Sequence, residues 1–401
     1  PTMFTGRRSL LRGWDANLQS RRNVGWRKIN NGCPCRIVMT ASNVASRLKE
    51  TSVRLPNGRA ILCANGKFPE KSFSELYQDV RACSAFLKGK GIERRDKVLL
   101  FVRSGYELIV LAFSLFFIGA VPVIIDPGMG LRSVLRCINR TQPDHLIGIP
   151  LTHWVSRLFY RSFKSVRGRI LIRSNQFSEQ MLAIPDNDSN PIGVSPNDLA
   201  AIVFTSGSTG PPKGVCYMHK TFDGQIRALK ETFGMQEGEV DMTTLPIFAL
   251  FNPALGITTV MPEINPSTPA KASARSLVEA LLDFEVTTTF ASPVIGRKIA
   301  NWCEQRNLKL PLMNRFFLAG APSPPSLIGK LASFMDNGKV FVPYGATEAL
   351  PVSYCSHTEV ADTRDSIERG EGSCLGQPLP GVSVKLFPVS SSPFGKEIQE
   401  V

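Results

Sequence analysis

Short apolar runs alternate with amphipathic segments from about residue 60 to residue 345. Apolar runs bounded by polar residues predict buried strands, whereas apolar residues three and four positions apart predict helices. The predicted strands are Val98–Val102, Val121–Ile125, Leu146–Ile149, Leu199–Phe204, Thr288–Phe290 and Arg315–Leu318. The predicted helices are Ser72–Lys88, Phe222–Phe233 and Ala274–Phe284. Strands separated by helices indicate an α/β fold with mostly parallel sheets and helices on both faces.

The longest apolar segment runs from Leu108 to Ile125 and holds 18 uncharged residues. This length is at the threshold for a membrane-spanning helix. Gly119 and Pro122 interrupt the second half, however, and charged residues stand directly before the segment. We therefore expect a buried helix over about 107–118 and a buried strand over about 120–125.

One helix start is marked by its own sequence. Ser72 is followed three residues later by Glu75. This is the spacing of a capping box, in which the hydroxyl and the carboxylate each satisfy a free backbone N–H group. We expect a helix to begin directly after Ser72.

The charge of the chain is uneven. The 401 residues include 47 Lys and Arg against 33 Asp and Glu, which gives a net charge of +14. Residues 1–38 hold eight basic residues and one acidic residue. We expect these residues to form a tail outside the fold, which then begins near Met39; a functional basic arm is the alternative. Because the charge of this tail is not interleaved with aromatic residues, we expect no nucleic-acid partner.

The nine cysteines and four histidines are scattered, and no Cys-x-x-Cys spacing occurs. Zinc sites and disulfide frameworks need tighter clusters. Scattered thiols suit a reducing compartment, so the sequence predicts a cytoplasmic protein.

Residues 154–173 carry six basic residues and no acidic one. Leu158, Phe159, Tyr160 and Phe163 lie between the basic residues. Such a pattern is typical of an interfacial helix that contacts acidic lipid, which would give peripheral membrane contact. A solvated basic surface is the alternative.

A predicted strand leads into a loop that is rich in Gly, Ser and Thr and ends at Lys213. Small residues let several backbone N–H groups converge on one anion, and a lysine adds a mobile charge for a phosphate. Pro212 precedes the lysine and Gly214 follows it, so this is not a Walker loop. The loop predicts a phosphate-binding site of another kind.

Four segments resemble, in order, the motifs of the adenylate-forming superfamily, which includes acyl-CoA synthetases, luciferases and peptide-synthetase adenylation domains. The segment from Thr205 to Gly214 agrees with the signature Thr-Ser-Gly-Ser/Thr-Thr-Gly-x-Pro-Lys-Gly at every position. The other three segments are Gly320-Ala321-Pro322, Tyr344-Gly345-Ala346-Thr347-Glu348 and the glycine-rich stretch from Gly372 to Gly381.

This resemblance implies ATP and Mg²⁺ as cofactors and assigns a role to each motif. The residues implied for the ATP phosphates are Thr205, Ser206, Gly207, Ser208, Thr209, Gly210 and Lys213. Those implied for adenine are Gly320, Ala321, Pro322, Tyr344, Gly345 and Thr347. Glu348 is implied as the magnesium ligand, and Thr205, Lys213 and Glu348 as the catalytic residues.

The resemblance also implies a domain plan. The fold would be the large N-terminal domain of the adenylate-forming family. A linker rich in Pro, Asn, Asp and Ser, residues 185–191, divides it into a first α/β subdomain over 39–190 and a second over 191–350. Residues 351–401 would form the start of a β-barrel subdomain, frayed because its partner strands would lie further along. The C-terminal domain, with its lysine, and the ribose-binding aspartate would be absent, so we expect the chain to catalyse adenylation poorly.

The branch of the family is indicated by the segment from Pro246 to Gly256, which lacks the histidine of many acyl-activating relatives. Together with the residues around Tyr344, it looks like the β-lactone synthetases of bacterial long-chain olefin biosynthesis. That likeness implies a 2-alkyl-3-hydroxy fatty acid as substrate, a pocket that includes Phe248, Phe251 and Ala349, and other enzymes of a lipid pathway as partners. A fatty acyl-CoA ligase and a nucleotide-binding module without turnover are the alternatives.

Overall fold

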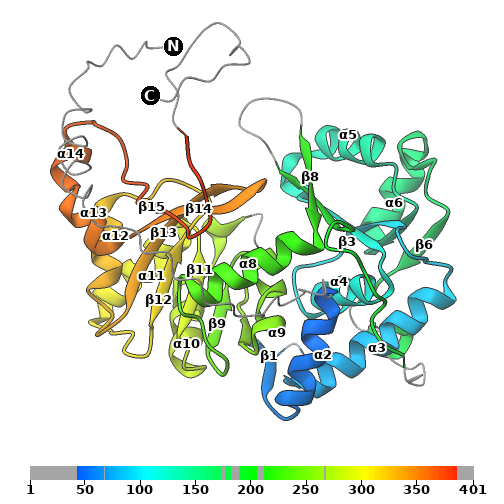
Figure 1. The fold of residues 1–401 in the computed structure, drawn as a ribbon, viewed down its shortest axis with the longest axis horizontal. Coiled ribbons are helices and arrows are strands. Elements are labelled where there is room, and N and C mark those ends of the chain that lie inside the picture. The colour runs from blue at the N-terminus through cyan, green and yellow to red at the C-terminus, as the bar shows by residue number, and fades with distance from the viewer. Residues whose placement is uncertain are drawn as a thin grey trace, which may run out of the picture. The chain divides into compact units, whose positions relative to one another are not determined.

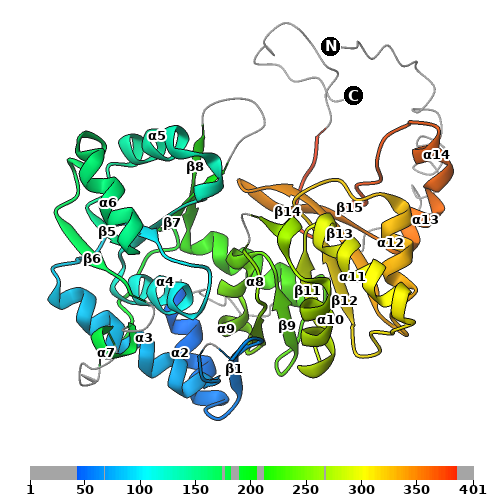
Figure 2. The same cartoon turned by 180° about the vertical axis from the view of Figure 1, so that it is seen from behind.

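The structure is a computed structural model that describes residues 43–66, 68–173, 177–181, 189–205, 212–265 and 268–385. The contacts separate residues 1–40 from residues 41–401, and all described residues belong to the second unit. The predicted tail, residues 1–38, lies outside them. Figures 1 and 2 show the expected α/β architecture, with helices packed against two sheets.

The elements alternate along the chain as the sequence pattern predicts. The strands are β1 (Arg59–Cys63), β2 (Lys71–Ser72), β3 (Lys97–Phe101), β4 (Val121–Ile125), β5 (His145–Gly148), β6 (Gly168–Leu171), β7 (Leu199–Thr205), β8 (Lys213–Met218), β9 (Val240–Thr243), β10 (Thr258–Met261), β11 (Thr288–Ala291), β12 (Arg315–Leu318), β13 (Lys339–Ala346), β14 (Ala349–Ser356) and β15 (Gln377–Pro378). The α-helices are α2 (Val44–Arg54), α3 (Phe73–Gly89), α4 (Tyr106–Ile118), α5 (Leu131–Thr141), α6 (Pro150–Leu158), α7 (Phe177–Met181), α8 (His219–Glu231), α9 (Asn252–Leu255), α10 (Ala274–Asp283), α11 (Pro293–Arg306), α12 (Pro325–Ala332), α13 (His357–Asp362) and α14 (Arg364–Glu368). The 3-10 helices are η2 (Pro127–Met129), η3 (Tyr160–Phe163), η5 (Pro246–Leu250) and η6 (Pro269–Lys271).

The first sheet has six strands in the order β6-β5-β3-β4-β7-β8. All neighbours are parallel except β7 and β8, which form an antiparallel hairpin. Parallel strands need crossover connections, and helices such as α4 and α5 supply them. The carboxyl ends of the parallel strands therefore share one edge of this sheet, and the β7–β8 hairpin projects from that edge.

The second sheet has nine strands in the order β15-β14-β13-β12-β11-β9-β10-β1-β2. Its six central strands are parallel, and antiparallel strands close both ends. Helices α10, α11 and α12 pack on one face, where Phe316 and Leu318 contribute to a shared core. The alternate residue Phe317 faces the opposite core, as the two-residue period of a strand requires.

The sheets do not divide the chain at the predicted boundary near residue 190. Strands β1 and β2 come early in the sequence but extend the nine-stranded sheet through β10. Strands β7 and β8 follow the boundary but complete the six-stranded sheet through β4. Strand order depends on pairing between distant segments, so a linker-like composition does not locate the change of sheet.

The segment after Leu350 also differs from its prediction. In the described part of residues 351–401, β14 pairs antiparallel with β13, and β15 pairs with β14. These strands extend the nine-stranded sheet instead of starting a barrel or fraying. Ser353 Oγ donates to the Leu375 carbonyl at 2.7 Å, which fixes the glycine-rich stretch from Gly372 against β14. Residues 386–401 lie outside the described residues.

Helix α4 confirms the prediction of a buried helix. All of its residues from Ile109 to Ile118 are buried, and all except Ser114 belong to the largest core cluster, together with residues of α2, α3 and α8. Among the described residues, every helix is too short or too polar to span a membrane. The predicted capping box is also present, because Ser72 and Glu75 exchange backbone and side-chain hydrogen bonds at the start of α3.

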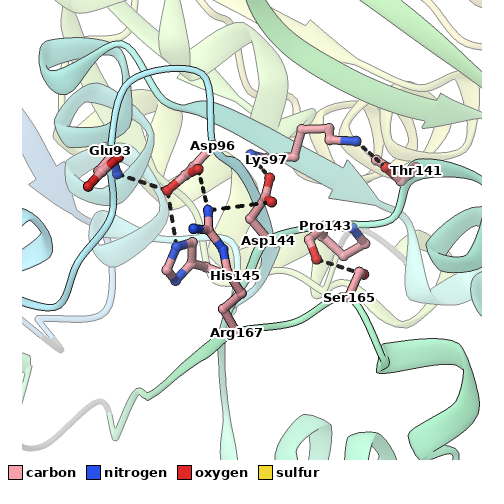
Figure 3. Close-up of polar contacts among 9 residues, drawn as sticks. All are labelled: Glu93, Asp96, Lys97, Thr141, Pro143, Asp144, His145, Ser165 and Arg167. Atoms are coloured by element: carbon pink, nitrogen blue, oxygen red, sulfur yellow. Dashed lines mark hydrogen bonds and ion pairs between the residues drawn. The ribbon is translucent and has the colours of Figure 1, made fainter.

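A polar cluster with a buried His145–Asp96 pair at its centre ties the amino ends of three parallel strands together, as Figure 3 shows. His145 Nε2 lies 3.1 Å from Asp96 Oδ2, and Arg167 Nη2 donates to Asp96 Oδ1 at 2.6 Å. Asp144 accepts from the Lys97 N–H group at 2.9 Å. These residues stand at the starts of β3, β5 and β6, at the edge opposite the β7–β8 hairpin. Because it lies at the edge away from the predicted phosphate loop, we expect the cluster to stabilise the fold.

We expect Gly168→Ala to lower the free energy of unfolding by about 1–3 kcal/mol, the usual cost of overpacking. A Cβ at position 168 would stand 2.5 Å from Nδ1 of the buried His145, which is held in place by Asp96. Urea denaturation measures the change. Gly193→Ala is the matched control, since a Cβ there meets nothing within 4 Å. Equal losses in both variants would contradict the role of this contact.

Candidate active site

The predicted phosphate loop lies between β7 and β8 of the six-stranded sheet. Thr205 ends β7, Lys213 begins β8, and the two are Cα partners in the ladder. Ser206, Gly207, Ser208, Thr209 and Gly210 lie outside the described residues. Lys213 is exposed and belongs to the last pair of the β7–β8 ladder before the loop.

The Tyr344–Glu348 motif forms the end of β13 and the turn into β14. Tyr344 is 49% exposed, which is unusual for a large aromatic side chain and leaves a ring available for stacking. Gly345 permits the tight approach of the two strands, because a Cβ there would meet the Ala349 carbonyl oxygen at 2.6 Å. Glu348 lies in the turn and is exposed, and so is Ala349.

The Gly320-Ala321-Pro322 segment follows β12, the parallel neighbour of β13. Gly320 has φ +90°, in the left-handed region that glycine adopts without strain. Gly320, Ala321 and Pro322 are all exposed. The structure thus brings this segment and Tyr344 to the same carboxyl edge of the nine-stranded sheet, where open α/β sheets bind their ligands.

Two residues that the sequence did not indicate join the two parts of the site. Tyr217, on β8, donates its hydroxyl hydrogen to the Thr347 carbonyl at 2.8 Å. Gln225, on α8, donates to the Leu350 carbonyl at 3.0 Å. The strand that begins at Lys213 is therefore bonded to the turn that carries Glu348. No motif marks Tyr217 or Gln225, since each acts through contact with a segment more than a hundred residues away.

The electrostatics of this junction favour a neutral tyrosine. Burial raises the pKa of the Tyr217 hydroxyl; the interaction with Gln225 lowers it in part, and the negative charge of Glu348 adds a smaller increase. A tyrosine with a raised pKa keeps its proton and remains a hydrogen-bond donor. The bond to Thr347 is therefore maintained at neutral pH.

Two of the three predicted substrate-pocket residues, Phe248 and Phe251, join an aromatic group, whereas Ala349 begins β14 and is in none of its ring contacts. Phe248 stacks on Phe290 at 4.3 Å between ring centroids, and Phe290 stacks on Phe317 at 4.2 Å. Phe290 and Phe317 are register partners in β11 and β12, so the sheet itself aligns their rings. Phe251 is buried and packs against the α8 side chain Phe222. Phe248 is only half-buried and stands at the end of these stacked rings.

A buried carboxylate lies beneath this aromatic segment, and the sequence did not indicate it. Asp241 of β9 is fully buried, and its Oδ2 accepts from Asn252 Nδ2 at 2.7 Å. Asn252 also donates to Thr259 Oγ1 at 3.1 Å. Burial raises the pKa of Asp241 to about 7, and the nearby charge of Glu239 adds to this effect. The pair anchors the first turn of α9, directly after Phe251.

Few of the described side chains are grouped in a way that could bind a metal ion. Among them, no group of three or more His, Cys, Asp or Glu residues could hold an ion. Magnesium commonly takes one or two carboxylates and completes its shell with waters and substrate phosphates. Glu348 fits that pattern, because its exposed carboxylate stands in the turn that Tyr217 joins to the phosphate-loop strand.

The fold and these motifs agree with a family match over most of the chain. The model of the AMP-binding enzyme family matches residues 48–395, and the chain belongs to this family. The olefin β-lactone synthetase of Stenotrophomonas maltophilia is 37% identical over 377 residues, which cover 88% of this chain and 66% of that protein. A long-chain-fatty-acid–CoA ligase of Thermus thermophilus is 22% identical over 83% of this chain and 62% of that protein. The chain thus spans about two thirds of the length of these relatives or slightly less.

A solved structure agrees with the fold. The N-terminal domain of FACL13 from Mycobacterium tuberculosis matches with a TM-score of 0.72 and 19% identity, over 84% of this chain and 82% of that one. This likeness confirms the predicted fold class, the large N-terminal domain of the adenylate-forming fold.

Proposed function

We propose that the protein activates a carboxylic acid with ATP, as an acyl-adenylate. An oxygen of the carboxylate attacks the α-phosphorus of ATP, a new P–O bond forms, and pyrophosphate leaves. The bond from Tyr217 to Thr347 carries this proposal, because it joins the phosphate-loop strand to the turn that bears Glu348. One nucleotide could then contact Lys213 with its phosphates and the exposed ring of Tyr344 with its base.

Each residue of the proposed site has a role that suits its chemistry. Lys213 would offset the charge of the phosphates, and the loop before it would add backbone N–H donors. Glu348 would hold Mg²⁺, which supplies charge neutralisation to the departing pyrophosphate when it is bound. Tyr344 would stack on adenine beside Gly320 and Ala321. Transfer of a phosphorus centre depends mainly on positioning and electrostatics, and these side chains are suited to both.

We further propose that the acid is a 2-alkyl-3-hydroxy fatty acid that closes to a β-lactone. The 3-hydroxyl oxygen attacks the acyl carbon, its proton is released, and AMP leaves. An internal nucleophile has a high effective concentration and needs no thiol cosubstrate. The 37% identity to an olefin β-lactone synthetase supports this branch. A fatty acyl-CoA ligase is the second candidate, supported by the more distant Thermus thermophilus relative.

Product analysis separates these candidates. The protein is incubated with ATP, Mg²⁺ and a 2-alkyl-3-hydroxy fatty acid, with and without CoA, and the products are identified by mass spectrometry. We expect AMP, pyrophosphate and a β-lactone in both reactions. A CoA thioester that forms only with CoA, with no lactone, would favour the ligase. ATP binding without any acid-dependent AMP would favour a binding module.

We expect Glu348→Gln to raise the Mg²⁺ concentration needed for half-maximal pyrophosphate release by roughly tenfold, because it removes an anionic ligand and keeps the side-chain size. A magnesium titration of parent and variant measures the change. Glu304→Gln is the control, since Glu304 is an exposed glutamate on α11 that pairs with Lys330. Titration curves that coincide for Glu348→Gln and parent would exclude Glu348 as the ligand.

A further inference from the structure

Helix α6 presents large apolar side chains to solvent. Leu151, Trp154 and Leu158 are 65%, 62% and 57% exposed. They are three and four positions apart, so they lie on one face of the helix. Tyr160, two residues after Leu158 at the start of η3, is 64% exposed. Contiguous exposed apolar side chains of this size mark interaction sites in folded proteins.

The opposite face of α6 is polar and buried, which reverses the usual arrangement of a surface helix. Thr152 and Ser156 point inward, and the Ser156 hydroxyl donates to the His153 carbonyl at 2.8 Å. His153 Nε2 lies 3.1 Å from the Ile170 carbonyl oxygen and fixes the helix on β6. The orientation of α6 is therefore set by contacts within the protein, and its apolar face remains outside.

The surroundings of this face are strongly basic. Residues 131–173 contain nine basic residues and one acidic residue, Asp144, which already accepts from Lys97 and pairs with Arg167. Exposed basic residues lie in or just after α6, η3 and β6; they are Arg157, Arg161, Lys164, Arg169 and Arg173. Within the described part of the chain, none of these five forms an ion pair with a carboxylate.

Helix α5 extends the positive charge. Its exposed Arg132, Arg136 and Arg140 are four positions apart and share one face. Asn139 Nδ2 donates to Ser162 Oγ at 3.2 Å, which joins α5 to η3. Figures 1 and 2 both show α5 beside α6. Apolar and cationic groups are thus gathered on adjacent elements of one subdomain.

We propose that Leu151, Trp154, Leu158 and Tyr160, with the basic residues around them, form a docking surface for an acidic phospholipid bilayer. We call this the basic apolar surface. Its aliphatic and aromatic side chains can enter the region between headgroups and acyl chains, while the arginines meet the anionic headgroups. A nucleic acid would use the arginines and Trp154 but would gain little from Leu151 and Leu158.

The structure changes the sequence-based form of this idea. Residues 154–173 do not make one interfacial helix, because α6 ends at Leu158 and the chain continues through η3 into β6. Phe163 is buried in the core and cannot contact lipid. The contact would instead be made by one face of α6 and by Tyr160. None of these residues belongs to the proposed active site, so the proposal does not depend on the catalytic assignment.

Vesicle flotation tests the proposal. The full chain is mixed with vesicles of equal parts phosphatidylglycerol and phosphatidylcholine, or of phosphatidylcholine alone. We expect binding to the acidic vesicles that weakens as salt rises. The double variants Trp154→Ser with Leu158→Ser, and Arg157→Gln with Arg161→Gln, should each lower the partition coefficient roughly tenfold or more. The controls Leu312→Ser and Arg297→Gln, exposed at other places, should bind as the parent does.

Residues 1–38 are also basic, so the variants are repeated in a full chain whose basic residues over 1–38 are replaced by glutamine. Tryptophan quenching by brominated phospholipid, compared between the parent and Trp154→Phe, reports insertion of that ring without a disruptive substitution. The proposal is overturned if the neutral-tail chain does not float, if its double variants float equally well, or if Trp154 is not quenched. Loss of poly(U) binding in the variants with unchanged vesicle binding would overturn it in favour of RNA.

Discussion

Replacing Lys213 with alanine is expected to lower the rate of acid-dependent pyrophosphate release by about 10²–10³, the usual effect of removing one well-placed electrostatic contact. Lys213 stands at the first position of β8 and is exposed, so its side chain contributes little to packing before phosphate arrives. The affinity for ATP should fall as well, by roughly tenfold. The fold should be unchanged, with the same midpoint of thermal unfolding.

Calorimetric titration with ATP and a coupled pyrophosphate assay give the two measurements. Lys220→Ala is the matched control, because Lys220 is also exposed and lies seven residues further along, on α8. Unchanged ATP affinity and rate in Lys213→Ala would remove the phosphate-loop assignment. Equal losses in both lysine variants would indicate a general effect of positive charge and not a specific contact.

Replacing Asp241 with asparagine is expected to change how stability depends on pH. The pKa of Asp241 is raised from 3.8 to about 7 by burial. The folded protein therefore keeps this proton between about pH 4 and pH 7, whereas the unfolded chain releases it. Because its pKa is higher in the folded state, Asp241 stabilises the folded protein at low pH. This contribution to the free energy of unfolding is lost as the pH rises through 7. Between pH 5 and pH 8 the parent should lose about 2–3 kcal/mol relative to the variant.

Urea unfolding of both proteins at pH 5 and pH 8 measures this difference, and other titrating groups cancel in the comparison. Asparagine keeps the size of the side chain and its amide oxygen can accept from Asn252, so the variant should fold. Asp283→Asn, which replaces an exposed carboxylate at the end of α10, should follow the parent. A parent and an Asp241→Asn variant with parallel pH dependence would show that Asp241 is ionised in the folded state.

The sequence pattern predicts the central strands and the buried helix well, because these elements rest on local periodicity. The runs around Val121 and Leu199 are apolar over their whole length, as expected for strands covered on both faces. Helix α4 is apolar all round, which a buried crossover helix requires. The motif at Tyr344–Glu348 likewise forms a strand end and a turn at the carboxyl edge of a sheet, where ligands of such folds bind.

The remaining features depend on distant pairing, which local patterns do not contain. Nothing in Arg59–Cys63 indicates that it pairs with Thr258–Met261, so the division into two sheets does not coincide with the predicted boundary near residue 190. The exposed face of α6 was only partly indicated by the sequence. The basic residues around Leu158 and Tyr160 predicted an interfacial helix, but its true bounds, and the burial of Thr152 and Ser156 on the opposite face, depend on packing against β6.

The bonds from Tyr217 and Gln225 to the β13–β14 turn have a consequence for chimeric proteins. A designer who transplants the β13–β14 turn from a relative would keep backbone carbonyls at positions 347 and 350, but these accept from Tyr217 and Gln225 only if the new turn follows the same backbone path. The segments that should be exchanged together are therefore separate in the sequence. They are the turn, β8 and the first half of α8. Recombination breakpoints between Gln225 and Tyr344 would separate partners that must be inherited from the same parent.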